Sequence, residues 1–168
     1  MGVLPDAHGL YQRLTAREHL RYFGQLHGLG APALERRIEA LEELLDMGGI
    51  SGRKAQGFSH GERTKVSIGR ALIHDPRTVL MDEPTNGLDV GTTRAVRGLI
   101  RRMREEGRCV LFSSHIMQEV AALCDRIVIL ADGRVAAEGT PDELRARSGH
   151  ASLEDAFVAL SGMDEVEP

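Results

Sequence analysis

The sequence predicts an α/β fold in which a helical part precedes a parallel sheet. The first observation is a set of three short, continuous apolar runs at 78–81, 108–112 and 126–130, as in buried strands. The second is that amphipathic helical segments separate these runs, which implies βαβ units and a parallel sheet covered on both faces. The third is the spacing of apolar residues over 34–45, which is typical of a helix.

The first part of the chain is predicted to be helical with polar connections. Residues 1–14 are expected to form a loop, because a proline and a glycine interrupt them. The capping-box sequence Thr15–Glu18 predicts a helix that runs to about His27, after which glycines and Pro32 break the chain. The helix over 34–45 then ends at a pair of glycines.

The rest of the chain alternates helices with the predicted strands. A second capping box, Ser59–Glu62, starts a helix that ends before the first strand, and further helices follow the first and second strands. Asp132-Gly133 is typical of a type I′ hairpin turn after the third strand. Two C-terminal helices, the first capped at Thr140, precede an acidic tail beyond Gly162 that is expected to fray.

Composition argues against several classes of function. With 168 residues, 42% hydrophobic and 27% charged, the chain fits one globular domain that can bury a core. A net charge of −4 does not favour non-specific nucleic-acid binding, and no apolar run approaches the ~20 residues of a membrane span. Cys109 and Cys124 lack metal-ligand spacing, and a reducing compartment fits them.

The strongest chemical motif follows the first predicted strand. Thr78–Met81 delivers two adjacent carboxylates, Asp82 and Glu83, to the carboxyl end of a strand, where ligands bind in open α/β sheets. Neighbouring residues on a strand point in opposite directions, so one acid can face a metal-bound phosphate while the next faces a water. Taken alone, the pair is equally compatible with a polar strand exit.

Three further motifs accompany this pair in a fixed order. Asn86–Asp89 follows it directly, Phe58–Glu62 precedes it, and Ser113–His115 comes after the next strand. The set, which spans essentially the whole chain, resembles the ABC-type ATPase family and implies a partial P-loop NTPase fold. Shorter stretches are similar to the sodium-efflux and ABC-2 type exporter cassettes. These stretches are Gly9–Tyr11, Leu14–Glu18, Arg70–Pro76 and Leu153–Phe157.

The resemblance implies a role for each motif, with ATP and Mg²⁺ as cofactors. Asp82 would hold Mg²⁺ through water, and Glu83 would orient or deprotonate the attacking water. His115 would donate a hydrogen bond to the charge that develops on the terminal phosphate. The remaining implied positions are the Q-loop residue Asp6, the D-loop residues Asn86, Gly87, Leu88 and Asp89, and the signature residues Ser59, His60, Gly61 and Glu62.

The signature segment has a physical basis for binding phosphate. A helix that starts after Ser59 presents free amides and partial positive charge at its N-terminus. Gly61 lacks a Cβ and allows close approach of backbone. Ser59 and Glu62 can also simply cap their own helix. In the family, this helix contacts ATP held by the opposite subunit of a dimer.

The sequence departs from the family pattern at several points. No Gly-x-x-x-x-Gly-Lys-Ser/Thr occurs in it, so the chain is expected to be the C-terminal portion of a cassette whose P-loop lies upstream. Asp6 stands where most cassettes have glutamine, and Phe58, His60 and Glu62 depart from Leu-Ser-Gly-Gly-Gln. An anionic Glu62 would repel a phosphate unless the helix N-terminus and a neighbouring cation offset its charge.

The chain is expected to be a single incomplete ABC ATPase domain over 1–168. Residues 1–14 would form the Q-loop region, 15–77 the helical subdomain, 78–140 the catalytic core and 141–168 the C-terminal helices and tail. The implied function is ATP hydrolysis that drives an exporter at the cytoplasmic face of the cell membrane. The implied partners are a second ATPase subunit in a head-to-tail dimer and a multi-span permease, with no nucleic acid.

Two alternatives remain open. One is a degenerate half-cassette that supplies its signature helix in trans without hydrolysing ATP, although retention of Glu83 and His115 argues mildly against it. The other is a soluble ABC protein of DNA repair or translation, against which the absence of long arm insertions argues. The sequence also predicts an open sheet edge, and therefore marginal stability or self-association of the chain alone.

Overall fold

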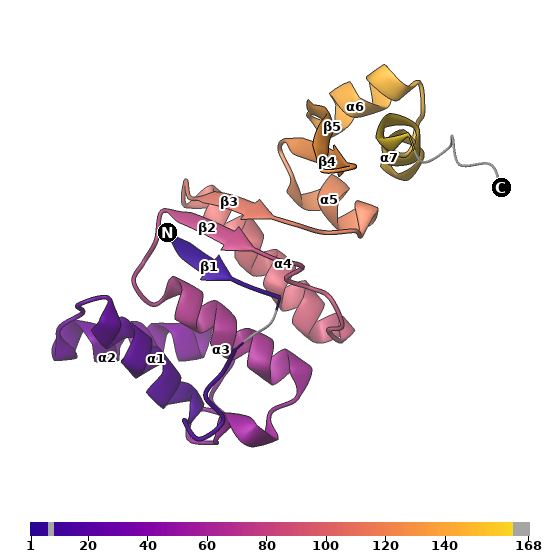
Figure 1. The fold of residues 1–168 in the computed structure, drawn as a ribbon. Coiled ribbons are helices and arrows are strands. Elements are labelled where there is room, and N and C mark those ends of the chain that lie inside the picture. The colour runs from indigo at the N-terminus through magenta and orange to yellow at the C-terminus, as the bar shows by residue number, and fades with distance from the viewer. Residues whose placement is uncertain (7–8, 163–168) are drawn as a thin grey trace. The chain divides into compact units, whose positions relative to one another are not determined.

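The computed structural model describes residues 1–6 and 9–162 of the chain (Figure 1). The acidic tail, for which fraying is predicted, lies outside the described residues. Two compact units follow one another along the sequence, Met1–Ser113 and Ser114–Pro168. Within the described ranges, no helix is both long enough and apolar enough to cross a membrane.

The first unit contains a parallel sheet with the strand order β1-β2-β3. Its strands are β1 (Gly2–Leu4), β2 (Thr78–Met81) and β3 (Cys109–Phe112). Leu4, Met81 and Phe112 lie side by side at the carboxyl ends. Two predicted strands are thereby confirmed. The predicted loop over 1–14 is wrong at β1, because three residues before a proline carry too little pattern and only pairing with β2 makes them a strand.

Two helices contact this sheet, α3 (His60–Leu72) against β1 and α4 (Val90–Glu105) against β3 (Figure 1). Two more, α1 (Ala16–Leu26) and α2 (Ala31–Leu44), pack together, and α1 packs on α3; a 3-10 turn lies at Ala55–Gly57. The capping boxes predicted at Thr15 and Ser59 are both present. Pro32, predicted to break the chain, lies instead in the first turn of α2, where its missing N–H leaves no intrahelical bond unmade.

Close contacts within the first unit depend on glycines. A Cβ at Gly69 of α3 would lie 2.8 Å from a methyl group of Leu20 on α1. A Cβ at Gly2 of β1 would collide with the backbone carbonyl of Ala71 on α3. β1 and α3 therefore touch backbone to backbone, with no side chain between them.

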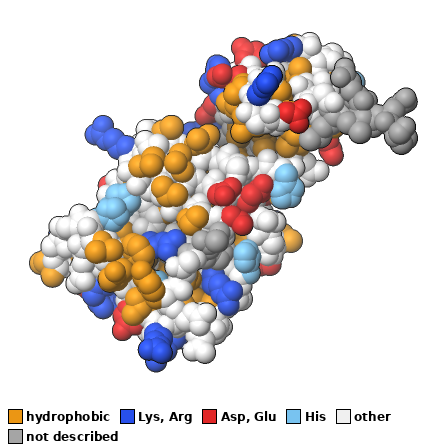
Figure 2. Space-filling view, in the orientation of Figure 1, with side chains coloured by type: hydrophobic (Ala, Val, Ile, Leu, Met, Phe, Trp, Pro, Cys, Tyr) orange, Lys and Arg blue, Asp and Glu red, His pale blue; other side chains and the backbone are white. Residues whose placement is uncertain are grey.

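The other face of the sheet carries exposed and half-buried side chains, most of them apolar, and we call it the open face. Its members, which alternate along the strands with less exposed positions, are Val3, Thr78, Leu80, Cys109 and Leu111. Val3 is 46% exposed and Leu111 is 62% exposed. Figure 2 shows hydrophobic side chains gathered over these strands. The prediction of a sheet covered on both faces is wrong for the described residues, because an apolar run does not reveal which element covers each side.

The second unit is a β-hairpin with three described helices. Its elements are α5 (Met117–Leu123), β4 (Ile127–Ala131), β5 (Arg134–Gly139), α6 (Pro141–Ser148) and α7 (Leu153–Ser161). Asp132 and Gly133 both have positive φ, +50° and +72°, as the predicted type I′ turn requires. β4 pairs antiparallel with β5 rather than joining the parallel sheet, because a tight turn makes the next strand its nearest partner.

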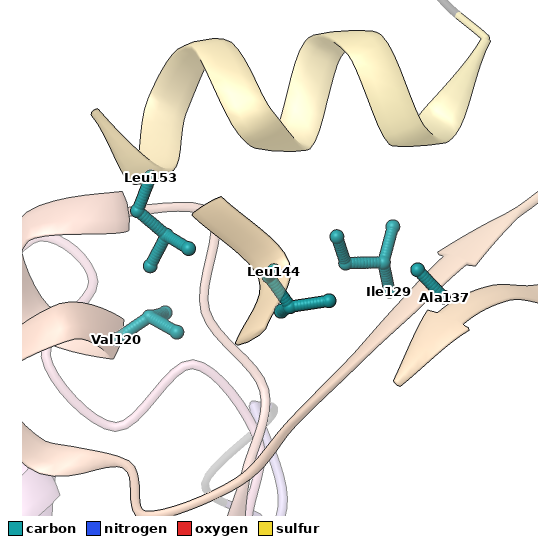
Figure 3. Close-up of a cluster of buried hydrophobic side chains, with 5 residues drawn as sticks. All are labelled: Val120, Ile129, Ala137, Leu144 and Leu153. Carbon is teal, nitrogen blue, oxygen red and sulfur yellow. The ribbon is translucent and has the colours of Figure 1, made fainter. Parts of the chain in front are cut away.

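A small hydrophobic core holds the second unit together (Figure 3). Its buried members come from two strands and three helices, and they are Val120, Ile129, Ala137, Leu144 and Leu153. Leu144 of α6 is fully buried, and Phe157 of α7 packs against the cluster. Each element of the hairpin-and-helix unit thus contributes to one core.

Candidate functional site

The carboxyl ends of the three parallel strands bring the predicted acids to one edge. β1 leads to Asp6, β2 leads to Asp82 and β3 leads to Ser113. The backbone ladder continues past the strands, since the Asp82 amide donates to the Leu4 carbonyl and the Ser113 amide to the Met81 carbonyl, each at 2.9 Å. This edge is where open α/β sheets bind ligands.

A hydroxyl of the neighbouring strand holds the acid pair. Ser113 Oγ donates to Asp82 Oδ1 at 2.7 Å and accepts from the Glu83 amide at 2.9 Å. Glu83 has φ +44°, in a left-handed region that residues other than glycine, asparagine and aspartate rarely adopt. Such a conformation persists where surrounding contacts fix it, and it is concentrated at functional sites.

A narrow hollow at this edge is lined by residues from four of the predicted motifs. Asp6 comes from the predicted Q-loop, His60 from the signature, and Asn86 from the D-loop. The acid pair, Asp82 and Glu83, also lines the hollow. The fold therefore brings together five residues that are up to 80 positions apart in the sequence.

The predicted D-loop connects the exit of β2 to α4 and touches the signature helix. His60 Nε2 donates to the Asn86 carbonyl at 2.9 Å, and Gly87 turns the chain there with φ +67°. Asp89 is the N-cap of α4 and accepts from the amide and the hydroxyl of Thr92, at 2.9 and 2.7 Å. These hydrogen bonds lower the pKa of Asp89. Leu88, the remaining member, is half-buried.

The N-terminus of α3 is built as the sequence predicts. Ser59 Oγ accepts from the Glu62 amide at 3.2 Å, and Glu62 Oε2 accepts from the Ser59 amide at 2.8 Å. Arg53 Nη1 lies 2.6 Å from Glu62 Oε1, so Arg53 is a cation of the kind expected to offset the charge of Glu62. The Ser59 hydrogen bond and then Arg53 lower the pKa of Glu62. A Cβ at Gly61 would lie 3.3 Å from Thr92 Oγ1, so this helix start passes close to that of α4.

The capping interpretation of Ser59 and Glu62 is thus confirmed, whereas phosphate binding by the same helix stays a prediction. His115 lies in the second unit, exposed, between β3 and α5. Its role beside the acid pair also stays a prediction.

Sequence reasoning assigned no role to two residues of this site, Ser113 and Arg53. The signal for Ser113 is its place directly after an apolar strand that is parallel to the strand of Asp82. Arg53 gives no comparable signal, because its contact with Glu62 depends on a turn between helices whose path the sequence pattern does not define.

The oxygen chemistry of the site fits Mg²⁺ in the way that nucleotide-binding proteins hold it. Asp82 is exposed, and its Oδ2 accepts no hydrogen bond from the described residues. Among those residues, no three His, Cys, Asp or Glu side chains converge into a metal cage. Magnesium retains several waters and commonly takes only one or two carboxylates plus phosphate oxygens. A single free carboxylate oxygen at the strand edge suits that pattern.

Comparisons with known proteins agree with this architecture. Residues 1–86 match the family described as ABC transporter. The ABC transporter ATP-binding protein NatA of Bacillus subtilis is 46% identical over 136 residues, which are 81% of this chain and 55% of NatA. The linearmycin resistance ATP-binding protein LnrL of the same organism is 33% identical over 165 residues, which are 98% of this chain and 52% of LnrL.

A solved structure gives the same result for the fold. A chain described as the ATP binding subunit of an ABC transporter aligns with TM-score 0.86 and 33% identity, covering 95% of this chain and 68% of that one. The fold is accordingly a partial P-loop NTPase fold, and the chain belongs to the ABC transporter family of ATP-binding proteins. It spans about half the length of the curated relatives it matches.

Proposed function

We propose that the chain belongs to the ATP-binding subunit of an exporter-type ABC transporter and that this subunit couples ATP hydrolysis to transport. The observation that carries the proposal is the convergence of Asp6, Asp82 and Glu83 with the signature residue His60 around one hollow. The similarity to NatA, to LnrL and to the Nod factor export ATP-binding protein I of Cupriavidus pinatubonensis, 33% identical over 144 residues, supports an exporter.

The acid pair divides the work between its two members. Asp82, with one oxygen held by Ser113 and the other left open, would hold Mg²⁺ through water. The ion, when bound, neutralises charge that develops on the phosphates. Glu83 orients or deprotonates the attacking water; the residue is half-buried, and its backbone amide donates to Ser113 Oγ. As the resemblance implies, Asp6 would bind the metal or accept a hydrogen bond, and His115 would donate a hydrogen bond to the terminal phosphate.

A second ATPase subunit completes the site in this proposal. The N-terminus of α3, with Ser59, His60, Gly61 and Glu62, contacts ATP held by that subunit in a head-to-tail dimer. Arg53 supports this role, because it offsets the negative charge of Glu62 at the same helix start. In this proposal the chain is a single incomplete ATPase domain, with the Q-loop region 1–14, the helical subdomain 15–77, the catalytic core 78–140 and the C-terminal helices and tail 141–168 as its successive parts.

A permease partner fits an exposed aromatic patch on the first unit. Tyr11, Tyr22 and Phe23 contact one another with ring centroids 5.3–6.4 Å apart, and Arg70 lies 5.0 Å above the Phe23 ring. The buried His19 fixes the position of Tyr11 by accepting from its amide at 2.9 Å. Figure 2 shows hydrophobic side chains gathered over α1. Docking there would place the subunit at the inner face of the cell membrane.

The test is ATP hydrolysis by the full-length protein and its Glu83→Gln variant. General bases contribute roughly 10²–10⁴-fold, so we expect a loss of at least about a hundredfold in kcat with ATP binding retained. Glu105→Gln is the matched control, because Glu105 is an exposed acid at the end of α4, and it should leave both unchanged.

Each outcome decides between the proposal and its alternative. Hydrolysis that survives in Glu83→Gln removes this residue from the mechanism. A wild-type protein that stimulates hydrolysis by an intact ATPase partner but hydrolyses nothing itself supports the half-cassette alternative, in which only the signature helix is used.

A further inference from the structure

We propose that Ser113 is a positioning residue for hydrolysis, which sets the orientation of the Asp82 carboxylate and the left-handed backbone of Glu83 together. This inference rests on the proposed function and adds a residue that acts through the acid pair. It starts from two hydrogen bonds at one hydroxyl, 2.7 Å to Asp82 Oδ1 and 2.9 Å from the Glu83 amide.

The direction of both bonds is determined by chemistry. A backbone amide can only donate, so the Glu83 N–H takes a lone pair of Ser113 Oγ. The single hydroxyl proton of Ser113 is then free to point at the Asp82 carboxylate, which accepts it. A bond of this kind to an ionised acceptor is shorter and stronger than one between neutral groups.

The geometry fixes what remains available on Asp82. Because Oδ1 is engaged by Ser113, the carboxylate has one preferred rotation about its terminal bond, and Oδ2 is the oxygen left open. Without the hydroxyl, that terminal torsion is broad, as is usual for a side chain ending in a carboxylate. Ser113 therefore determines which oxygen is offered to a hydrated metal ion.

The same hydroxyl holds the strained residue. Glu83 at φ +44° has its amide directed at Ser113 Oγ, and the amide of Asn86 donates to the Glu83 carbonyl at 3.1 Å. These bonds lie on opposite sides of the left-handed residue. Without the bond to Ser113 Oγ, Glu83 can relax towards an ordinary backbone conformation. Its carboxylate then moves away from its place beside Asp82.

Strand pairing does not need this hydroxyl. β2 and β3 are joined in register from the Thr78–Cys109 pair to the Met81–Phe112 pair, and the Ser113 backbone continues the ladder. Ser113 is exposed, so its side chain fills no core position. A variant that lacks only the hydroxyl should keep the fold.

The experiment compares Ser113→Ala, Ser113→Thr and Ser114→Ala in the full-length protein. Ser114 is the matched control, because among the described residues its hydroxyl accepts from the nearby Ile116 amide at 3.1 Å and contacts neither acid. Two quantities are measured beside the melting temperature. The first is the Mg²⁺ concentration for half-maximal ATP hydrolysis, and the second is Mn²⁺ affinity with a non-hydrolysable ATP analogue, followed by the electron paramagnetic resonance of free Mn²⁺.

We expect Ser113→Ala to weaken Mn²⁺ binding and to raise the half-maximal Mg²⁺ concentration by about tenfold, the effect of losing one hydrogen bond to a charged group. Nucleotide affinity in EDTA and the melting temperature should be unchanged. Ser113→Thr keeps the hydroxyl and should restore metal binding, and Ser114→Ala should match the wild type.

Two results would overturn the inference. One is a Ser113→Ala protein with wild-type Mn²⁺ affinity, and the other is a loss of nucleotide affinity that is equally large in EDTA. Failure of the proposed function has a different signature, because the wild-type protein would then bind no metal-nucleotide at all.

Discussion

Four residues other than glycine hold positive φ values in the described structure, and three of them are aspartates at turns, Asp46, Asp75 and Asp132. Aspartate tolerates this region because its short side chain bonds locally to the backbone. Glu83 is the exception, since its longer side chain gives no such relief. Glu83 directly follows Asp82, the candidate metal ligand, and is itself the proposed base. The strained backbone and the proposed chemistry therefore lie at the same residue.

Two glycines give opposite predictions at the residue scale. Gly2→Ala should destabilise the first unit by about 1–3 kcal/mol, because its Cβ would collide with the backbone of Ala71, which cannot move aside. Gly98→Ala should stabilise it by about 0.5–1 kcal/mol, since Gly98 lies inside α4 with open space around it. Urea unfolding of the two variants checks both signs. A Gly2→Ala protein as stable as the wild type would show that β1 and α3 can separate without cost.

Ion pairs join α1 to α2 at the scale of elements. Arg17 and Arg21 of α1 both reach Glu35 of α2, at 3.0 and 2.8 Å, and Arg17 also reaches Glu42 at 2.6 Å. Glu35 receives the hydrogen bonds of Arg21 and then of Arg17, which lower its pKa to about 2. The pair of helices is therefore held by charges as well as by its apolar contacts.

The pH dependence of stability follows from this shift. The pKa of Glu35 in the folded protein is below its ordinary value of 4.5. Its contribution to the free energy of unfolding is therefore complete above pH 4.5 and is lost as pH falls towards 2. We expect the free energy of unfolding to fall over that window, and Glu35→Gln to flatten the fall. Glu43→Gln on the same helix, where Glu43 is exposed and the structure records no ion pair for it, is the control. An unaltered slope in Glu35→Gln would contradict the prediction.

At the scale of the whole molecule, the open face is the largest departure from an ordinary globular sheet. Parallel sheets are normally covered on both faces, and this one shows Val3, Leu80 and Leu111 on its uncovered side. Self-association of the chain alone, expected from its open edge, stays a prediction. The open face adds a second reason for it, since exposed apolar patches promote association.

The two cysteines provide a measure of that exposure. Cys109 lies on the open face, whereas burial, helped by Asp125, raises the pKa of Cys124 to about 11. At pH 8 a disulfide reagent such as Ellman's should therefore label one thiol quickly and the other slowly. Cys109→Ala should abolish the fast phase and Cys124→Ala the slow phase. A fast phase that survives in Cys109→Ala would contradict this assignment, and slow labelling of Cys109 in the full-length protein would show that another segment covers the face.

The sequence was sufficient for features that depend on local chemistry. The capping boxes at Thr15, Ser59 and Thr140 are present, because they need only two residues three positions apart. Strands β2 and β3 are apolar runs, and their parallel pairing follows from the helix between them. The convergence of Asp82 and Asp6 follows from strand direction, once β1 is known to be a strand.

The features that sequence reasoning missed depend on distant partners. β1 is a strand only because β2 lies beside it, and the sequence pattern did not show that β4, which pairs with β5 across the predicted turn, stays out of the parallel sheet. The contact of Arg53 with Glu62 crosses a turn whose path is defined by packing. The hydrogen bonds of Ser113 cross from one strand to the next. No periodicity in the chain encodes any of these four.

The backbone contact between Gly2 and Ala71 has a mechanical consequence. The helix that starts at Ser59 presses directly on the strand that leads to Asp6, and His74 Nε2 further donates to the Met1 carbonyl at 3.1 Å. A side chain between α3 and β1 could accommodate small displacements of one element by changing its rotamer. A backbone contact has no rotamer to change, so we expect the C-terminal end of α3 and β1 to move together as one rigid piece.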